Sequence, residues 1–221
     1  MHRKQKQHSP QSSQAGFTII ESLLAIIIVT VLMVAIGPVV FISVAARVQA
    51  RRVERATEAA KTYIDGVSSG SIKPPSVQVG TAFTATRASP SFLNNAPLPT
   101  TSNFPRLPNW STDSGFYCVD LDKTSGCSTS SSSDLVIQAF RTAGTAAQGY
   151  RLGVRVYRAD GFRPPVNFQR TQQAALKGTL GDRYAPLVTM ITDIAPTGTY
   201  ENSLPSWCNR LRNGSNRNSG C

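Results

Sequence analysis

One acidic side chain stands inside a long apolar run near the start of this 221-residue chain. It is Glu21, within the stretch GFTIIESLLAIIIVTVLMVAIGP at residues 16–38, and no other charged side chain follows until Arg47. A carboxylate in hydrocarbon costs several kcal/mol unless it is paired or lies close to the headgroups. Two interpretations are open: Glu21 pairs with a cation, or it lies at the headgroup level and needs no partner.

The four cysteines offer a second kind of chemistry, because an even number indicates disulfide bonds in an oxidising compartment. All lie in the second half of the chain, at Cys118, Cys127, Cys208 and Cys221. Three pairings are open, of which the local one, Cys118 with Cys127 and Cys208 with Cys221, closes two polar loops. Zinc binding and free thiols in a reducing cytoplasm are the competing interpretations, but the chain has no CxxC pair for zinc. We therefore expect no metal.

The remaining residues do not form a familiar catalytic set. The only histidines are His2 and His8, so the rest of the chain has no Ser-His-Asp triad, Cys-His pair or HExxH site. A P-loop motif is also absent from the sequence. We expect the chain not to be an enzyme and to bind no cofactor.

Carboxylates remain as candidates for acid–base chemistry or for a calcium site. Asp120 and Asp122 are expected to share one face of a strand, and Asp113 and Asp134 are close to them in the sequence. Paired acids at the end of a strand are usually solvated turn residues, and no EF-hand-like loop surrounds these. Solvated turn residues are the favoured interpretation, with calcium binding as the alternative.

The apolar run is long enough to cross a membrane. It continues as 25 uncharged residues, Ser22 to Ala46, whereas a hydrocarbon core needs about 20. Residues 1–16 carry three basic side chains and no acidic one, which is typical of a leader that does not fold by itself. A plain secretory signal cleaved after Ala45 is an alternative, but its apolar core would be too long.

The hexapeptide GFTIIE, residues 16–21, followed by the apolar run, resembles the processing and methylation motif of type IV prepilins and type II secretion pseudopilins. The resemblance implies cleavage by a prepilin peptidase between Gly16 and Phe17, and methylation of the new N-terminus at Phe17. It also implies that Glu21, the fifth residue after the cut, meets the N-terminal amine of a neighbouring subunit during filament assembly. That role favours the paired interpretation of Glu21.

A glycine and a proline interrupt the apolar run. Pro38 removes the helical hydrogen bond to Val34 and predicts a kink, and Gly37 loosens the backbone beside it. Many pilins carry a helix-bending proline at this place, so the resemblance implies a curved helix. A membrane helix that simply tolerates the proline is the alternative.

Helical spacing continues beyond the membrane segment. In RVQARRVERATEAAKTYIDGV, residues 47–67, apolar side chains recur at positions 53, 56, 60, 63, 64 and 67. We therefore predict one helix over residues 17–67, with a transmembrane segment at 17–46 and an amphipathic second half. Residues 1–16 form the leader and residues 68–221 the head.

The head is predicted to be β-rich with long loops. Four short runs rich in β-branched and aromatic residues are predicted as strands: Phe116 to Leu121, Leu135 to Arg141, Tyr150 to Arg158 and Leu187 to Ile194. Lys73 to Trp110 is predicted as a loop region and Asn167 to Leu176 as a short helix. The expected fold is α+β and type IV pilin-like, with the long N-terminal helix packed on an antiparallel β-sheet.

Two of these strand segments, DLVIQAFR and RLGVRVYR, resemble cyanobacterial hormogonium polysaccharide secretion pseudopilins, as does RVQARRVERA after the span. The resemblance implies a minor pilin or pseudopilin of a type IV pilus-like or type II secretion-like filament that assists polysaccharide secretion and gliding motility. Its implied partners are other pilin or pseudopilin subunits, prepilin peptidase, an inner-membrane assembly platform and the membrane. A DNA- or surface-binding minor pilin and a single-span anchored binding protein are the alternatives.

The net charge of the chain indicates which kinds of ligand it could bind. Without the three basic leader residues, 23 − 3 = 20 basic and 12 acidic side chains remain, a formal charge of +8. This balance is compatible with anionic partners such as an acidic polysaccharide or lipid headgroups, whereas DNA is not expected. Solubility and subunit contacts are the favoured interpretation of the charge. Arg151, Arg155 and Arg158 are expected on a solvated strand face.

Basic residues flank the span on both sides, so local charge does not decide the orientation of the chain. The cysteines and the resemblance place the head in the periplasm, with a single pass through the inner membrane and a cytoplasmic N-terminus.

Overall fold

A computed structural model describes residues 18–79, 90–105, 115–124, 126–144, 149–174 and 181–197, together with residues 205 and 208. The chain divides into two compact units, Met1–Val44 and Ala45–Cys221. The long helix α1, Ile19–Ser68, contributes to both units, so its two parts are described separately. Over the described residues, α1 confirms the prediction of one continuous helix.

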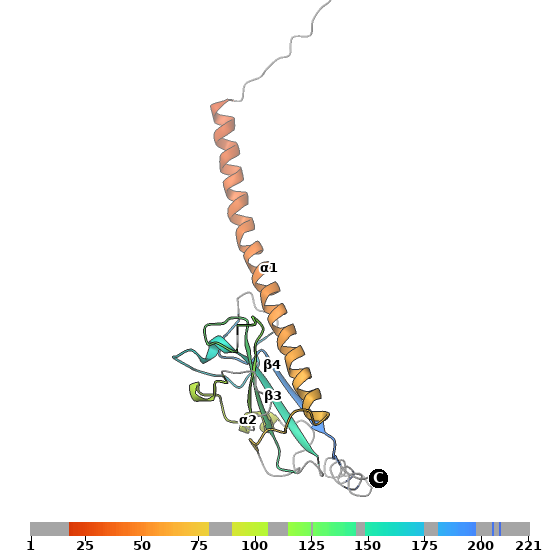
Figure 1. The fold of residues 1–221 in the computed structure, drawn as a ribbon. Helices are drawn as coiled ribbons and strands as arrows, with labels where there is room; N and C mark the ends of the chain where they lie inside the picture. The colour runs from red at the N-terminus through yellow and green to blue at the C-terminus, as the bar shows by residue number, and fades with distance from the viewer. Residues whose placement is uncertain are drawn as a thin grey trace, which may run out of the picture. The chain divides into compact units, whose positions relative to one another are not determined.

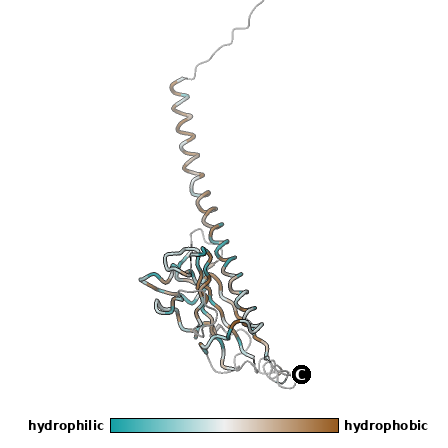
Figure 2. Tube along the Cα trace, viewed as in Figure 1, coloured by the Kyte–Doolittle hydropathy of each residue, from teal (hydrophilic) through white to brown (hydrophobic). Residues whose placement is uncertain are grey.

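The first part of α1 presents apolar side chains on every side. Each residue from Thr18 to Val44 is exposed, and the most apolar stretch of the helix has a mean hydropathy of 3.0. Its trace runs mostly from white to brown in Figure 2. Among the described residues, α1 is the one helix long and apolar enough to cross a membrane. A helix that is apolar all round requires a nonpolar environment, which a bilayer or neighbouring helices supply.

The helix passes through Gly37 and Pro38 without interruption. Pro38 has no N–H group, so the carbonyl of Val34 lacks its usual helical donor. A Cβ atom at Gly37 would meet no atom within 4 Å, so packing within this chain does not require a glycine there. The predicted kink stays a prediction.

The head contains a four-stranded antiparallel sheet (Figure 1). In chain order and in sheet order the strands are β1 Phe116–Val119, β2 Leu135–Arg141, β3 Tyr150–Arg158 and β4 Val188–Ile194. The bounds of β2 and β3 are those predicted, whereas β1 ends and β4 begins slightly inside the predicted ranges. The α+β prediction of a long helix and an antiparallel sheet is confirmed.

The second part of α1 covers one face of this sheet. Its buried side chains there are mainly alanines, Ala56, Ala59 and Ala60, whose small size lets the helix approach the sheet closely. Tyr63 follows on the same stripe, and its ring centroid lies 4.8 Å from that of Tyr117 on β1. The sheet residues of this core alternate along each strand, and those of β3 are Tyr150, Leu152, Val154 and Val156. The predicted amphipathic packing is thereby confirmed.

Loops and short helices cover the opposite face. The helix α2, Pro90–Asn95, packs Phe92 onto Phe140 of β2 with ring centroids 5.3 Å apart. The short 3₁₀ turns η1, Thr101–Asn103, and η2, Ala159–Phe162, lie along the covering segments, and Phe162 packs in a cluster with Tyr157 of β3. Strands β2 and β3 are therefore buried on both faces, whereas most of β4 is only partly buried.

Two local predictions in the covering segments were wrong. Residues 167–174, the described part of the predicted helix at Asn167–Leu176, are not helical. The backbone N–H groups of Gln169 and Gln173 donate instead to the carbonyls of Tyr184 and Pro186, at 3.0 and 3.1 Å. Hydrogen bonds to a distant segment thus replace those of a helix. The second difference is α2, which forms inside the region predicted as loop.

Candidate functional site

The first turn of α1 holds the carboxylate that the sequence singles out. Thr18 precedes the helix, and its Oγ1 accepts a hydrogen bond of 3.3 Å from the backbone N–H of Glu21, the pattern of an N-cap. Thr18 and Glu21 also have the Thr-x-x-Glu spacing of a capping box, and a negative charge in the first turn interacts favourably with the helix dipole. The carboxylate of Glu21 therefore lies in the first turn, where it interacts favourably with the helix dipole, a placement that the Thr-x-x-Glu pattern could have predicted.

The charge of Glu21 is not neutralised within the described part of the chain. Its side chain is exposed, and the two ion pairs among the described residues, Arg151 with Asp193 and Arg158 with Asp160, do not involve it. Gly16 and Phe17 lie outside the described residues. Cleavage after Gly16, methylation of Phe17 and pairing of Glu21 with an amine stay predictions.

One disulfide bond links the end of β1 to the loop that follows it. Cys118 and Cys127 are bonded, with Cα atoms 5.7 Å apart, as the local pairing predicted. Cys208 is disulfide-bonded as well. Cys221 lies outside the described residues, so its pairing with Cys208 stays a prediction. Disulfide bonds favour an oxidising compartment for the head.

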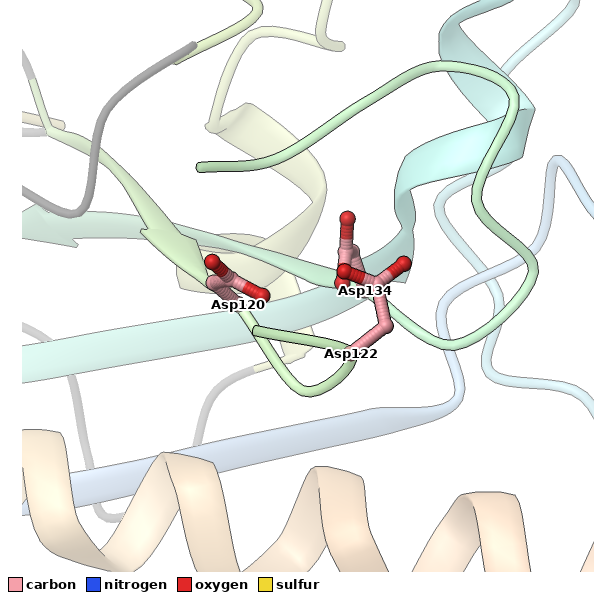
Figure 3. Close-up of side chains that lie close together, drawn as sticks. All are labelled: Asp120, Asp122 and Asp134. Atoms are coloured by element: carbon pink, nitrogen blue, oxygen red, sulfur yellow. The ribbon is translucent and has the colours of Figure 1, made fainter. Parts of the chain in front are cut away.

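Three aspartates of the connection between β1 and β2 converge beside this disulfide, and two of them lie in the loop that it closes (Figure 3). A carboxylate oxygen from each of Asp120, Asp122 and Asp134 lies within 4.8 Å of the other two. The prediction that Asp120 and Asp122 share a strand face was wrong, because β1 ends at Val119 and both residues belong to the connection to β2. Asp113, the fourth predicted carboxylate, lies outside the described residues.

Each of these carboxylates already accepts hydrogen bonds from the protein. Asp134 is fully buried and accepts from the backbone N–H groups of Leu121 and Ser128, both at 3.1 Å. Asp120 accepts from two backbone N–H groups of the same loop, at 2.6 and 2.9 Å. Buried Asp134 is thus not the solvated turn residue that was expected. The cluster organises the loop, and its hydrogen bonds do not by themselves indicate a calcium site.

The exposed member of the cluster is held by hydroxyl groups. Hydrogen bonds from Thr124 and then from Ser131 keep the pKa of the Asp122 carboxyl below its usual range. Stabilising the charged form in this way is the ordinary effect of donors on a carboxylate. Asp122 therefore stays ionised as a turn residue.

The arginines of β3 are buried, so their predicted placement on a solvated face was wrong. Exposed fractions are 9% for Arg151, 0% for Arg155 and 8% for Arg158. Arg155 lies under the covering segments, where it donates to the carbonyl of Leu93 and its guanidinium lies 5.3 Å from the Phe140 ring centroid. Burial lowers the pKa of Arg155. Arg158 lies on the other face of β3, because it continues the spacing of Leu152, Val154 and Val156 and lines a pocket with α1. The local pattern could not indicate that both faces of β3 are covered.

Comparison with known proteins identifies one segment. Residues 11–37 match the family model described as the prokaryotic N-terminal methylation motif. The match includes the predicted cleavage position, Glu21 and the start of the apolar helix. No curated protein and no solved structure matches the chain.

Proposed function

We propose that this chain, whose N-terminal methylation motif supports a protein of the type IV prepilin or pseudopilin type, is a minor subunit of a type IV pilus-like or type II secretion-like filament. The motif implies processing by a peptidase and assembly with other pilin subunits, and it is typical of a structural rather than an enzymatic protein. One apolar N-terminal helix indicates a single-pass membrane anchor, as in prepilins.

The observation that carries the proposal is the combination of an exposed apolar helix and an exposed, unneutralised carboxylate in its first turn. Residues 18–44 are all exposed, so neighbouring helices can pack there once the subunit leaves the bilayer. Glu21 is then surrounded by apolar side chains, and a cation must approach it to avoid a large desolvation cost. The amine of a neighbour that begins at Phe17 supplies that cation.

The substitution Glu21→Gln tests the role of Glu21 in filament assembly while leaving the start of the helix intact. Glutamine fits the last position of a capping box as well as glutamate does, so the start of the helix should be retained. Its amide cannot form the ion pair. Removing one partner of a buried ion pair costs about 3–5 kcal/mol, enough to weaken the subunit contact more than roughly a hundredfold. We expect the variant to accumulate in the membrane and to be lost from sheared filaments, as measured by quantitative immunoblotting of both fractions.

Glu54→Gln is the matched control, because Glu54 is an exposed glutamate further along the same helix. It should enter filaments at the wild-type level. If Glu21→Gln also enters at that level, the capping role is sufficient and the pairing role is wrong.

Processing is tested separately by intact mass and N-terminal sequencing of the membrane-extracted protein. The proposal requires a chain that begins at Phe17 and carries one added methyl group. A start near Ala46 would indicate a secreted protein, and an intact leader would indicate a plain membrane anchor. Either outcome would remove the amine that Glu21 is proposed to meet.

A narrower assignment rests on the resemblance of β2 and β3 segments to polysaccharide secretion pseudopilins and on the basic balance of the chain. The filament would assist polysaccharide secretion and gliding motility, with the head on the periplasmic side, where the disulfide bonds are stable. Deleting the gene should reduce exported polysaccharide while leaving its intracellular synthesis intact. Unchanged export would exclude this narrower role but not filament membership.

A further inference from the structure

A basic pocket opens between the second part of α1 and one end of the sheet. Its volume is about 250 Å³. Three arginines of α1 line it, Arg51, Arg52 and Arg55, and Arg158 at the end of β3 faces them. Ser132 and Ser133 add two hydroxyl groups from the loop before β2. Arginines and serines together form a donor set suited to an oxyanion, because guanidinium groups bind phosphate in a bidentate manner.

The positive charges of this pocket exceed the negative ones. Among the described residues, Arg158 forms an ion pair with Asp160, whereas no ion pair engages Arg51 or Arg55. Arg51 and Arg55 are four residues apart on one helix, an arrangement of like charges that destabilises a helix when no anion lies between them. The positive charges in the pocket therefore repel one another, and a bound anion would reduce this repulsion.

Buried Arg158 and partly buried Arg52 support the same conclusion. Arg158 is 8% exposed, and its Nε atom has no hydrogen-bond partner among the described residues. Burial, and next the positive charge of Arg158, lower the pKa of Arg52, while Asp160 partly compensates. Arginines held close together at such a cost are typical of anion sites.

The helix residues that line the pocket follow closely after the uncharged run in the sequence. The uncharged run ends at Ala46, and Val48, the first helix residue that lines the pocket, follows two positions later. At a rise of about 1.5 Å per residue, Arg51 lies roughly 7.5 Å beyond Ala46, comparable with the thickness of one headgroup layer. We propose that this pocket binds the phosphate group of an anionic phospholipid in the leaflet next to the head.

Size and composition favour a lipid headgroup over a polysaccharide chain. Pockets for drug-sized ligands measure roughly 300–1,000 Å³, so a pocket of about 250 Å³ suits one phosphate group and its immediate substituents. Val48 and Leu135 supply apolar surface beside the arginines, against which the glycerol and first acyl carbons can pack. Basic residues adjacent to a span are also attracted to anionic lipids.

The test uses the full-length processed protein in a neutral detergent micelle. Native mass spectrometry measures binding of four probes: short-chain phosphatidylglycerol, short-chain phosphatidylcholine, inorganic phosphate and a sulfated oligosaccharide. We expect phosphatidylglycerol to bind as a single copy and phosphatidylcholine to bind more weakly. The double variant Arg51→Gln/Arg55→Gln should bind phosphatidylglycerol roughly 30-fold more weakly, from the usual contribution of basic residues near an anionic surface. Both side chains are exposed, so the head should still fold.

Lys61→Gln/Lys73→Gln is the matched control, since it removes two exposed positive charges outside the pocket. It should change lipid binding less than about threefold. An equal loss in both double variants would overturn the proposal in favour of nonspecific charge attraction. Binding of inorganic phosphate without phosphatidylglycerol would overturn the lipid assignment, as would preferential binding of a sulfated oligosaccharide.

This inference requires α1 to be anchored in the membrane but does not require pairing of Glu21. The variant Glu21→Gln should therefore bind phosphatidylglycerol as the wild type does. Failure of filament assembly with normal lipid binding, or the reverse, shows which of the two proposals is wrong.

Discussion

The disulfide between Cys118 and Cys127 allows a quantitative test of what holds the head together. It closes a loop with a sequence separation of 9 residues. In the chain-entropy model, a closed loop of about ten residues stabilises the folded state by roughly 2.7 kcal/mol, because the crosslink restricts the unfolded chain. The loop's aspartate hydrogen bonds remain when the crosslink is removed. We therefore expect Cys118→Ser/Cys127→Ser to fold and to lose about 2–3 kcal/mol of unfolding free energy.

Urea unfolding of the full-length protein in a micelle measures this loss. Near-ultraviolet circular dichroism should be the probe, because the buried tyrosines of the head report its packing while the apolar part of α1 stays in the micelle. The double variant avoids chemical reduction, which would also break the bond at Cys208. A loss of unfolding free energy under about 1 kcal/mol would refute the view that the crosslink stabilises the head by restricting the unfolded chain. If the double variant shows no near-ultraviolet tyrosine signal in buffer without urea, the head has not folded. The claim that the aspartate hydrogen bonds hold the loop without the crosslink would then be refuted.

Two further predictions concern the sheet. In Gly153→Ala, the added Cβ would lie 2.4 Å from the Phe140 ring and 2.8 Å from the Phe92 ring. The substitution should destabilise the head by about 1–3 kcal/mol in thermal unfolding and loosen α2. An unchanged melting temperature would contradict this packing. Burial raises the pKa of Tyr150 to about 12, so the unfolded chain loses this proton first, near pH 10, and stability should fall as the pH rises from about 10 to 12. In Tyr150→Phe that alkaline fall should be smaller, as measured by unfolding at each pH, and an identical fall would contradict it.

Sequence patterns predicted most of the elements because those patterns are local. Twenty-five uncharged residues require a nonpolar environment whatever the rest of the chain does. The alternation in LVIQAFR and YRLGVRVYR predicts strands with two distinct faces, and the helical spacing of residues 53–67 predicts a stripe that packs on one of them. These signals depend on the period of neighbouring side chains, which the backbone geometry fixes.

The failures involve contacts between segments far apart in the chain. Residues 167–174 are not helical because Gln169 and Gln173 find hydrogen-bond partners near residue 185. Arg155 is buried because α2, more than sixty positions earlier, contributes the carbonyl of Leu93 above it. Neither partner can be recognised from the local pattern.

The candidate functional sites also differ in whether local sequence or contacts between distant segments define them. The sequence by itself determined the methylation motif and the apolar segment with Glu21 at its start, because each depends on residues close together in the chain. It left three cysteine pairings open, and the structure selected the local bond between Cys118 and Cys127. Tertiary structure alone decided that Asp134 joins Asp120 and Asp122 in one loop, and that Arg158 of β3 faces the arginines of α1. Packing of α1 on the sheet creates that pocket, since burial of its alanine stripe sets the position of the helix and brings distant positive charges together.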